Sequence, residues 1–406
     1  MRSAREQIPD FIETQQEKDT SLSRLGRFSL ASLSRAERFK RPMACIAAIG
    51  SMAIASSAGS SGKVVSLEAA GFNSGRVWVT DRAEAEAEAD RIVSLGGKII
   101  RVASPYTQGG ANIDNDAERL CVMAEVATEK KLDVMVSFEG RFRKDAKLGY
   151  IATIASEKQK FLTANIDMLN TLYGENGCAE KPGLFAISFV NEPNNPLFVR
   201  SQYVNGEWAV PEQVVSLYEY MYSRMHKEAD KLSLNLQIIG GELRQRNAIA
   251  FIRKMGDVIH ERKIISPIMD EFGQHLYLNG PDAENYESVF DTALQIQKAV
   301  KDNVGDIDMS VTELGAISDT QPGKEQYYDD KLPPHIKPVS EIAQGHFYHK
   351  FMDFAACNGI KRVLFFHVVD DRSILRTGLY RPDLSKKRGK GIVQEAIGNV
   401  HAGITC

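Results

Sequence analysis

The stretch FAISFVNEPN, residues 185–194, decides how the rest of the chain is interpreted. Its first six residues are mostly apolar and favour strands, which predicts a buried β-strand. The strand runs directly into Asn191, Glu192 and Pro193, an amide, an acid and a residue that ends regular structure. The stretch therefore raises the question of why a carboxylate stands where a buried strand ends.

Outward from this strand, short apolar runs alternate with longer segments of helical period from about residue 63 onward. A first strand is expected within 64–80, before a helix that contains AEAEAEADRIVSL (83–95). The other predicted strands cover 98–104, 132–138, 184–190, 234–240, 268–278, 307–312 and 362–369. The helices between and after them are predicted over 116–131, 156–172, from 211 onward, 247–262, 284–302, 339–357 and 390–399.

Eight βα units in about 340 residues fit an α/β fold of the (β/α)8 TIM barrel type. We expect it to form a single catalytic domain over residues 63–406. The continuous apolar strands agree, because parallel strands are buried on both faces. An open doubly wound sheet is the alternative, but it usually carries a glycine-rich phosphate loop after its first strand. Neither GxGxxG nor GxxxxGK[ST] occurs in the sequence.

The composition is that of an ordinary globular protein, with 43% hydrophobic and 25% charged residues. A net charge of −3 implies no broad attraction to nucleic acid. No run reaches the roughly 18 apolar residues of a membrane-spanning helix. We therefore expect neither a nucleic-acid partner nor a membrane span, and a monomeric chain.

Residues 1–62 differ from the rest and are expected to form a leader. The polar segment 1–42 ends in the basic stretch RFKRP (38–42), and MACIAAIGSMAIASSAGSSG (43–62) follows. A basic flank, an apolar core and a small-residue exit are the parts of a secretory signal. This pattern predicts a secreted or periplasmic protein, and the alternative is a disordered leader on a cytoplasmic one.

The chain contains five cysteines, and no two are spaced as CxxC, so no zinc site is expected. We expect no other metal and no cofactor. Cys45 lies in the expected leader, and the other four either pair in an oxidising compartment or remain free buried thiols. Those four are Cys121, Cys178, Cys357 and Cys406.

The strand ends supply a second carboxylate. Glu313 follows the seventh strand in DMSVTELGA (308–316), three βα units after Glu192. Active sites of (β/α)8 barrels lie at the C-terminal ends of the strands, and strands four and seven lie across the barrel mouth from each other. Two facing carboxylates serve as nucleophile and acid/base in retaining glycosidases, about 5–5.5 Å apart. The alternative is that both are ordinary polar groups at a barrel mouth.

At these residues the sequence resembles the retaining glycoside hydrolases of clan A. VNEPN (190–194) resembles the Asn-Glu signature of the clan's fourth strand, and VTELGA (311–316) resembles its nucleophile segment. The resemblance covers about 98–368 and is nearest to the cellulase-like family five, with family thirty-nine a near second. It implies an O-glycoside hydrolase that cleaves a β-linked poly- or oligosaccharide by double displacement, through a glycosyl-enzyme intermediate.

The resemblance also implies roles for individual residues. Glu192 is the acid/base, Glu313 the nucleophile, and Asn191 contacts the 2-hydroxyl of the sugar. Arg101 holds the nucleophile ionised, and an arginine that ends a buried strand needs such a partner. His275 and Tyr277 match the His-x-Tyr pair of the sixth strand, in which Tyr contacts the nucleophile and His contacts the sugar or the acid. Their spacing places both on one face of a strand.

The sequence departs from the family pattern at two strand ends. The third strand often ends in His, but here it ends in SFEGRFRK (137–144), which supplies Glu139. The eighth strand often ends in a Trp that floors the sugar, but here His367 stands at the matching position. With Trp78 and Trp208 as the only tryptophans, a long stacking cleft is not expected.

The predicted mouth loops hold further candidates. Trp208 and Tyr106 are candidate platforms for a sugar. The rim is charged, which hints at a substituted or acidic sugar. The rim residues are Glu139, Arg141, Arg143, Asp370 and Asp371.

Two other functions remain open. A catalytically silent carbohydrate-binding barrel would not need Glu192, Glu313 and Arg101 together. A metal-dependent (β/α)8 hydrolase would need metal ligands at several strand ends, such as a His-x-His after the first strand, and none is found.

Overall fold

The computed structural model describes most of the chain after residue 62. The described residues are 63–74, 81–107, 113–141, 157–195, 203–204, 207–208, 210–278, 286–319, 323–325, 337–370 and 376–406. Within these ranges the side chains of 104–107, 113–119, 139–141, 203–204 and 207–208 are left undescribed. The expected leader with its signal-like stretch, and Cys45 within it, lies outside the described residues. No helix in the described part is both long enough and apolar enough to span a membrane.

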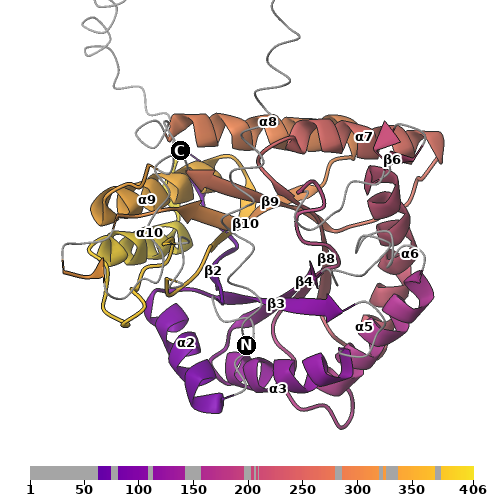
Figure 1. Cartoon of the computed structure of the whole chain (residues 1–406), viewed down its shortest axis with the longest axis horizontal. Coiled ribbons are helices and arrows are strands. Elements are labelled where there is room, and N and C mark those ends of the chain that lie inside the picture. Colours follow the sequence, from indigo (N-terminus) through magenta and orange to yellow (C-terminus); the bar gives the residue numbers. More distant parts are fainter. Residues whose placement is uncertain are drawn as a thin grey trace, which may run out of the picture. The chain divides into compact units, whose positions relative to one another are not determined.

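Eight parallel strands close into a barrel, in the order β10-β11-β2-β3-β4-β5-β8-β9 (Figure 1). The closure is made where β11 pairs with β2, which an open sheet would leave unpaired. The predicted (β/α)8 TIM barrel is therefore confirmed. The strands are β2 (Ala69–Asn73), β3 (Ile99–Thr107), β4 (Asp133–Arg141), β5 (Phe185–Ser188), β8 (Leu236–Arg244), β9 (Glu271–Leu278), β10 (Asp308–Ala316) and β11 (Ile360–Phe365).

Helices form a ring around these strands (Figure 1). The helices pack apolar side chains against the barrel. Two of them have a side-chain N-cap. Asp81 accepts hydrogen bonds from the backbone of Ala83 and Glu84, and Ser340 accepts one from Ala343. The helices are α2 (Arg82–Ser94), α3 (Ile113–Glu129), α5 (Lys158–Tyr173), α6 (Val210–Lys231), α7 (Ala248–Glu261), α8 (Glu287–Asn303), α9 (Glu341–Cys357) and α10 (Lys390–Ala402).

Two small two-stranded sheets lie outside the barrel. β1 (Val64–Val65) pairs antiparallel with β12 (Ile404–Thr405), which joins the start of the described chain to its end. β6 (Tyr203–Val204) and β7 (Glu207–Trp208) form a hairpin between β5 and α6. The hairpin therefore follows the strand that delivers Glu192.

The fifth barrel strand is longer than its sequence indicates. The prediction ended it at Gly240, but β8 continues through Gly241 and Glu242 to Arg244. Its register against β9 shifts between Gly241 and Leu243. Gly241 has a φ of +74°, and a Cβ there would lie 2.6 Å from the ring of Phe272. The two glycines therefore do not end the strand, and the bulge directly after them takes in Glu242.

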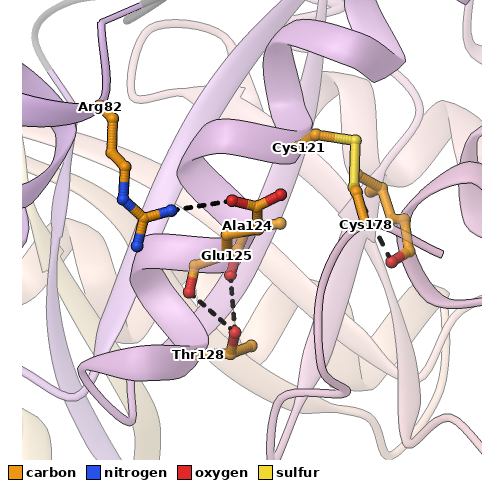
Figure 2. The surroundings of a disulfide bond; sticks show 7 residues. Arg82, Cys121, Ala124, Glu125, Thr128 and Cys178 are labelled. Carbon is orange, nitrogen blue, oxygen red and sulfur yellow. Dashed lines mark hydrogen bonds and ion pairs between the residues drawn. A yellow bond between two sulfur atoms is a disulfide. The ribbon is translucent and has the colours of Figure 1, made fainter.

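Two disulfides tie peripheral segments of the fold together. Cys121 on α3 bonds to Cys178 in the loop after α5, beside the Arg82–Glu125 ion pair (Figure 2). Cys357 at the end of α9 bonds to Cys406. Of the two states left open for these four cysteines, the structure shows the paired one.

Candidate active site

Glu192 follows β5 after three further residues, because the strand ends at Ser188 and not at Val190 as predicted. Its backbone conformation is one that residues other than glycine rarely adopt. Its φ is +44°, and its amide donates to the carbonyl of Glu242 over 2.9 Å. The preceding amide of Asn191 donates to the carbonyl of Phe138 over 3.1 Å. These bonds to the two neighbouring strands hold a left-handed residue in place and aim its side chain into the mouth.

Glu313 comes from β10, where it pairs in register with His275 of β9. Glu192 and Glu313 are both buried, at 9% and 4% exposure. An oxygen of each carboxylate and a ring nitrogen of His275 all lie within 4.8 Å of one another. The structure thus brings together the two acids that the sequence placed at the ends of strands four and seven.

Arg101 is the hub of the site. The sequence placed it at the end of its strand, but Arg101 is the third residue of β3, the second barrel strand. It is 2% exposed, so water hydrates its charge very little. Such a buried guanidinium requires acceptors on several sides. Its terminal nitrogens donate to oxygens of Glu313 (2.8 Å), Glu242 (2.6 Å), Asn191 (2.9 Å), Ser137 (2.9 Å) and Asn73 (2.5 Å).

His275 and Tyr277 lie on the same side of β9, as their spacing predicted. Nδ1 of His275 is 3.0 Å from Oε1 of Glu192 and 3.4 Å from Oε2 of Glu313. The hydroxyl of Tyr277 donates to the same Oε2 of Glu313. Glu313 is therefore held by Arg101 through one oxygen and by Tyr277 through the other.

A short relay supports Glu192 from its far side. Asn195 donates from Nδ2 to Oε2 of Glu192, and its Oδ1 accepts from Arg244 over 3.0 Å. Asn194 binds the backbone of residues 244 and 246, which pins the loop after β8 against the loop after β5. The orientation of Glu192 thus depends on strand five as well as on strand four.

The sequence interpretation missed two residues of the site. Glu242, on the extended part of β8, is fully buried and touches Arg101, and Asn73 ends the first strand and accepts from Arg101. The polar residue after each apolar strand was the signal that could have found them. It was applied to strands four and seven but not to strands one and five.

The three carboxylates and two basic groups perturb one another. Burial opposes the charge of His275, but Glu313, Glu192 and Glu242 outweigh it and raise the pKa of His275 to about 10. Burial also opposes the charge of Glu242, yet Arg101 and His275 hold its pKa well below the ordinary value. The imidazolium and Glu242 are therefore both charged at neutral pH.

The two facing acids are shifted in opposite directions. Burial raises the pKa of Glu313, and the charges of His275 and Arg101 only partly oppose it. Burial acts on Glu192 in the same sense, but its bond to His275 outweighs it and lowers the pKa of Glu192. In the free site a proton therefore binds more readily to Glu313 than to Glu192.

The remaining predicted residues are placed less directly. His367 follows β11 with a φ of +74°, and its ring stacks on Phe366 at 3.8 Å, which in turn packs on Tyr277. Glu139 lies in β4 and Trp208 in β7, and their side chains lie outside the described part. The sugar contacts assigned to these three residues and to Asn191 stay predictions.

The charged rim needs one correction. Asp370 is buried, and its Oδ1 accepts from Nζ of Lys387 over 2.8 Å and from the amide of Gly378. It was expected on the rim because it follows the eighth strand, but its partners draw it into the wall. Tyr106 and Arg141 contribute described backbone only, and Arg143 and Asp371 lie outside the described residues.

The only described group of donor atoms close enough to hold a metal ion is Glu192, His275 and Glu313. Every one of these residues already has a hydrogen-bond partner within the site.

Comparisons with known proteins identify the fold. No family model matches the sequence, and no curated protein matches it. An exo-β-1,4-mannosidase from Opitutaceae bacterium strain TAV5 is similar in structure, with a TM-score of 0.55, 14% identity, and coverage of 81% of this chain and 59% of that one. A GH2 β-galacturonidase from Eisenbergiella tayi has a TM-score of 0.52, 14% identity and coverage of 82% and 51%.

A β-glucuronidase from Bifidobacterium dentium, complexed with coumarin-3-O-glucuronide, has a TM-score of 0.51, 14% identity and coverage of 82% and 46%. The chain thus spans about half the length of the solved structures it resembles. At this identity the likeness shows the fold alone. The narrower resemblance to the cellulase-like family five or to family thirty-nine is not confirmed.

Proposed function

We propose that the chain is a retaining β-glycosidase, an O-glycoside hydrolase for a β-linked poly- or oligosaccharide. The observation that carries the proposal is the pair Glu192 and Glu313, whose nearest donor atoms lie within 4.8 Å. Retaining glycosidases place their carboxyl groups about 5–5.5 Å apart, and inverting ones about 6.5–9.5 Å. The close approach of these two acids supports the retaining reaction over the inverting one.

The reaction proceeds in two displacements. The carboxylate of Glu313 attacks the anomeric carbon, the glycosidic C–O bond breaks, and Glu192 donates its proton to the leaving oxygen. Glu192 then removes a proton from a water molecule, whose oxygen attacks the anomeric carbon and releases Glu313. Arg101 and Tyr277 hold the two oxygens of Glu313, which supports its charge before attack and on release.

Glu192 has to enter the reaction protonated and Glu313 ionised. In the free site the pKa of Glu313 is raised and that of Glu192 is lowered, so substrate binding must reverse which of the two acids carries the proton. His275 offers the means, because its Nδ1 lies only slightly nearer to Glu192 than to Glu313. A small movement of this N–H toward Glu313 when sugar binds stabilises the nucleophile's charge. It also withdraws the bond that keeps the pKa of Glu192 low.

The charged side chains near the site narrow the class of sugar that we propose as substrate. Arg244 is half-buried at the end of β8 and bonds to Asn195, which itself holds Glu192. A cation beside the acid/base lies on the leaving-group side and favours an acidic or substituted sugar there. Two of the similar structures bear the names β-galacturonidase and β-glucuronidase, and a third is named an exo-β-1,4-mannosidase. These names support β-glycoside cleavage and leave the sugar to be measured.

We also propose that the protein is exported. The signal-like stretch 43–62 motivates this, and the disulfides Cys121–Cys178 and Cys357–Cys406 support it, because disulfides persist in oxidising compartments. Expression of the full chain with N-terminal sequencing of the protein outside the cytoplasm tests it. A product that stays in the cytoplasm with its leader intact contradicts export.

The function is tested with a panel of aryl β-glycosides, neutral and uronic, followed by Glu313→Ala on the best substrate. We expect the variant to lose nearly all activity, and azide to restore part of it by giving the α-glycosyl azide. Glu287→Ala, which changes an exposed glutamate at the start of α8, is the control and should match the wild type. A β-glycosyl azide from Glu313→Ala would reverse the two roles, and absence of turnover on every substrate would favour a silent binding barrel.

A further inference from the structure

Glu242 is a carboxylate that the two-acid reaction does not use. It is fully buried, and the bulge at Gly241 carries it into the barrel mouth. Its Oε2 accepts from Nη2 of Arg101 over 2.6 Å and from Oγ of Ser137 over 2.8 Å. Burying a third carboxylate beside two catalytic ones is costly for folding, so its retention calls for a role in the site.

The second oxygen of Glu242 points to that role. Oε1 lies 3.6 Å from Nε2 of His275, and neither atom has a hydrogen-bond partner within the described residues. On its other side the imidazole presents Nδ1 to Glu192 and Glu313. Both ring nitrogens therefore face carboxylate oxygens, which come from β8, from β10 and from the segment after β5.

This arrangement determines the protonation of the ring. A neutral imidazole has one N–H and one lone pair, so one of its nitrogens would direct a lone pair at an anion. An imidazolium presents an N–H to each side. Arg101, the other cation of the cluster, is bonded to Glu242 and Glu313 and does not replace the imidazolium at Glu192.

We propose that Glu242 is a positioning residue that keeps His275 doubly protonated, so that Nδ1–H remains available to Glu192 and Glu313 throughout the reaction. The inference rests on the proposed glycosidase function. The raised pKa of His275 and the lowered pKa of Glu242 agree with it.

The effect should be greatest in the second displacement. Once the sugar is bound to Glu313 as an ester, that carboxylate has no charge, and Glu192 must become the base. An N–H from His275 stabilises the charge on Glu192, whereas a lone pair on Nδ1 would repel it. Glu242 therefore acts on hydrolysis of the intermediate through His275, without touching the sugar.

The direct test is NMR of the full chain labelled with 15N-histidine, in wild type and in Glu242→Gln, from pH 5 to 10. The chain has 8 histidines, and His275→Gln identifies the signal. We expect both ring nitrogens of His275 to remain protonated to about pH 9 in the wild type, and the midpoint to fall by at least about one pH unit in the variant. A singly protonated ring in the wild type at pH 7 overturns the proposal, whether or not the variant folds.

Two further variants separate charge from packing. Oε2 of Glu242 accepts from Ser137 as well as from Arg101, and Ser137→Ala removes the first of these bonds. The carboxylate itself remains, so the titration of His275 should stay close to that of the wild type. Glu242→Asp retains the charge and should restore most of the shift. If Ser137→Ala lowers the midpoint as much as Glu242→Gln does, packing explains the effect and the proposal fails.

Kinetics supply the second readout, with a dinitrophenyl glycoside of the best sugar. Its leaving group departs without an acid, so kcat reports hydrolysis of the intermediate. We expect the alkaline limb of kcat to move to lower pH in Glu242→Gln by the shift seen in the NMR titration. If the enzyme hydrolyses the glycoside but neither the titration of His275 nor the alkaline limb of kcat moves in Glu242→Gln, the glycosidase function stands and the role of Glu242 is overturned. If the titration moves but the wild type hydrolyses nothing, only the glycosidase function is overturned.

Discussion

Among the described residues of the barrel strands, two arginines are buried, one toward each end of the barrel, and their surroundings differ. Arg101 lies at the C-terminal mouth, and Arg362 lies near the start of β11 at the opposite end, at 2% and 1% exposure. Arg362 donates from Nη1 to Glu271, at the start of β9, and from Nη2 to Glu68, just before β2. At both ends a guanidinium thus joins carboxylates from separate strands.

The difference lies in where the negative charge is placed. Glu68 leaves 49% of its side chain exposed, so water shares its charge, and burial raises the pKa of Glu271 despite Arg362. At the mouth three carboxylates are buried around Arg101 and His275, where solvent shares little of their charge. The lower cluster links β11 to β9 and to the residue just before β2. The upper one lies at the end of the barrel where this fold carries its active sites.

The largest effect should come from breaking the upper cluster with Arg101→Met. Without the guanidinium, Glu313 loses a positive charge that partly opposes its raised pKa, and Glu242, Asn191 and Ser137 lose their common donor. We expect kcat/KM on an aryl β-glycoside to fall by about 10³-fold or more, a loss comparable to removing a key electrostatic group. Normal kinetics in a folded variant would remove Arg101 from the reaction.

The matched change at the other end is Arg362→Met. It leaves Glu271 buried without its partner, and breaking a buried pair costs about 3–5 kcal/mol. We expect chemical denaturation to show a loss of this size, while kcat of the folded enzyme stays within about twofold of wild type. A large fall in kcat at full folding would mean that the two ends are not separate in role.

The contrast also shows what the sequence could reveal. The eight strands follow from apolar runs set between helical segments, because burial on both faces dictates that pattern. Glu192 and Glu313 were found because polar residues at strand ends are informative in a parallel barrel. His275 and Tyr277 followed from their alternation on one strand.

The failures have equally physical causes. Glu242 was missed because Gly240 and Gly241 look like the end of a strand, and only the pairing with β9 shows that the strand continues past them through a bulge. Asp370 was expected on the rim because its partner Lys387 lies on a later segment, and no local pattern announces that pair. Long-range pairing of charges is decided by packing, which a single sequence does not display.

A smaller effect is expected from removing the disulfides. Cys121–Cys178 closes 57 residues of chain, and removing such a bond typically costs about 2–4 kcal/mol, mainly through the unfolded state. Cys121→Ala/Cys178→Ala should lower Tm and leave kcat unchanged. Cys357→Ala/Cys406→Ala, which frees the chain's end, provides the comparison. Equal Tm values for wild type and both variants would contradict a stabilising role.

The smallest effect is expected from a second histidine–carboxylate pair, His226 and Asp270. This pair is partly exposed, whereas His275 is buried. Asp270 accepts from Nε2 of His226 (2.9 Å), from the hydroxyl of Tyr222 (2.6 Å) and from the amide of Ile238 (2.7 Å). The bond to Asp270 raises the pKa of His226 despite burial. Burial works against the charge of Asp270, but the bond to His226 and its other partners lower the pKa of Asp270.

The signs define a pH window for this pair. The contribution of His226 is complete below its unfolded pKa near 6.5 and disappears as pH rises through the higher folded value. The contribution of Asp270 is present above 3.8 and disappears as pH falls through its lower folded value. His226→Gln keeps a donor but removes the charge, so its Tm should fall below that of wild type between about pH 4 and 6.5 and converge with it at higher pH. His346→Gln, at an exposed position of α9, should show a constant difference, and a constant difference for His226→Gln would mean that its charge adds nothing to stability.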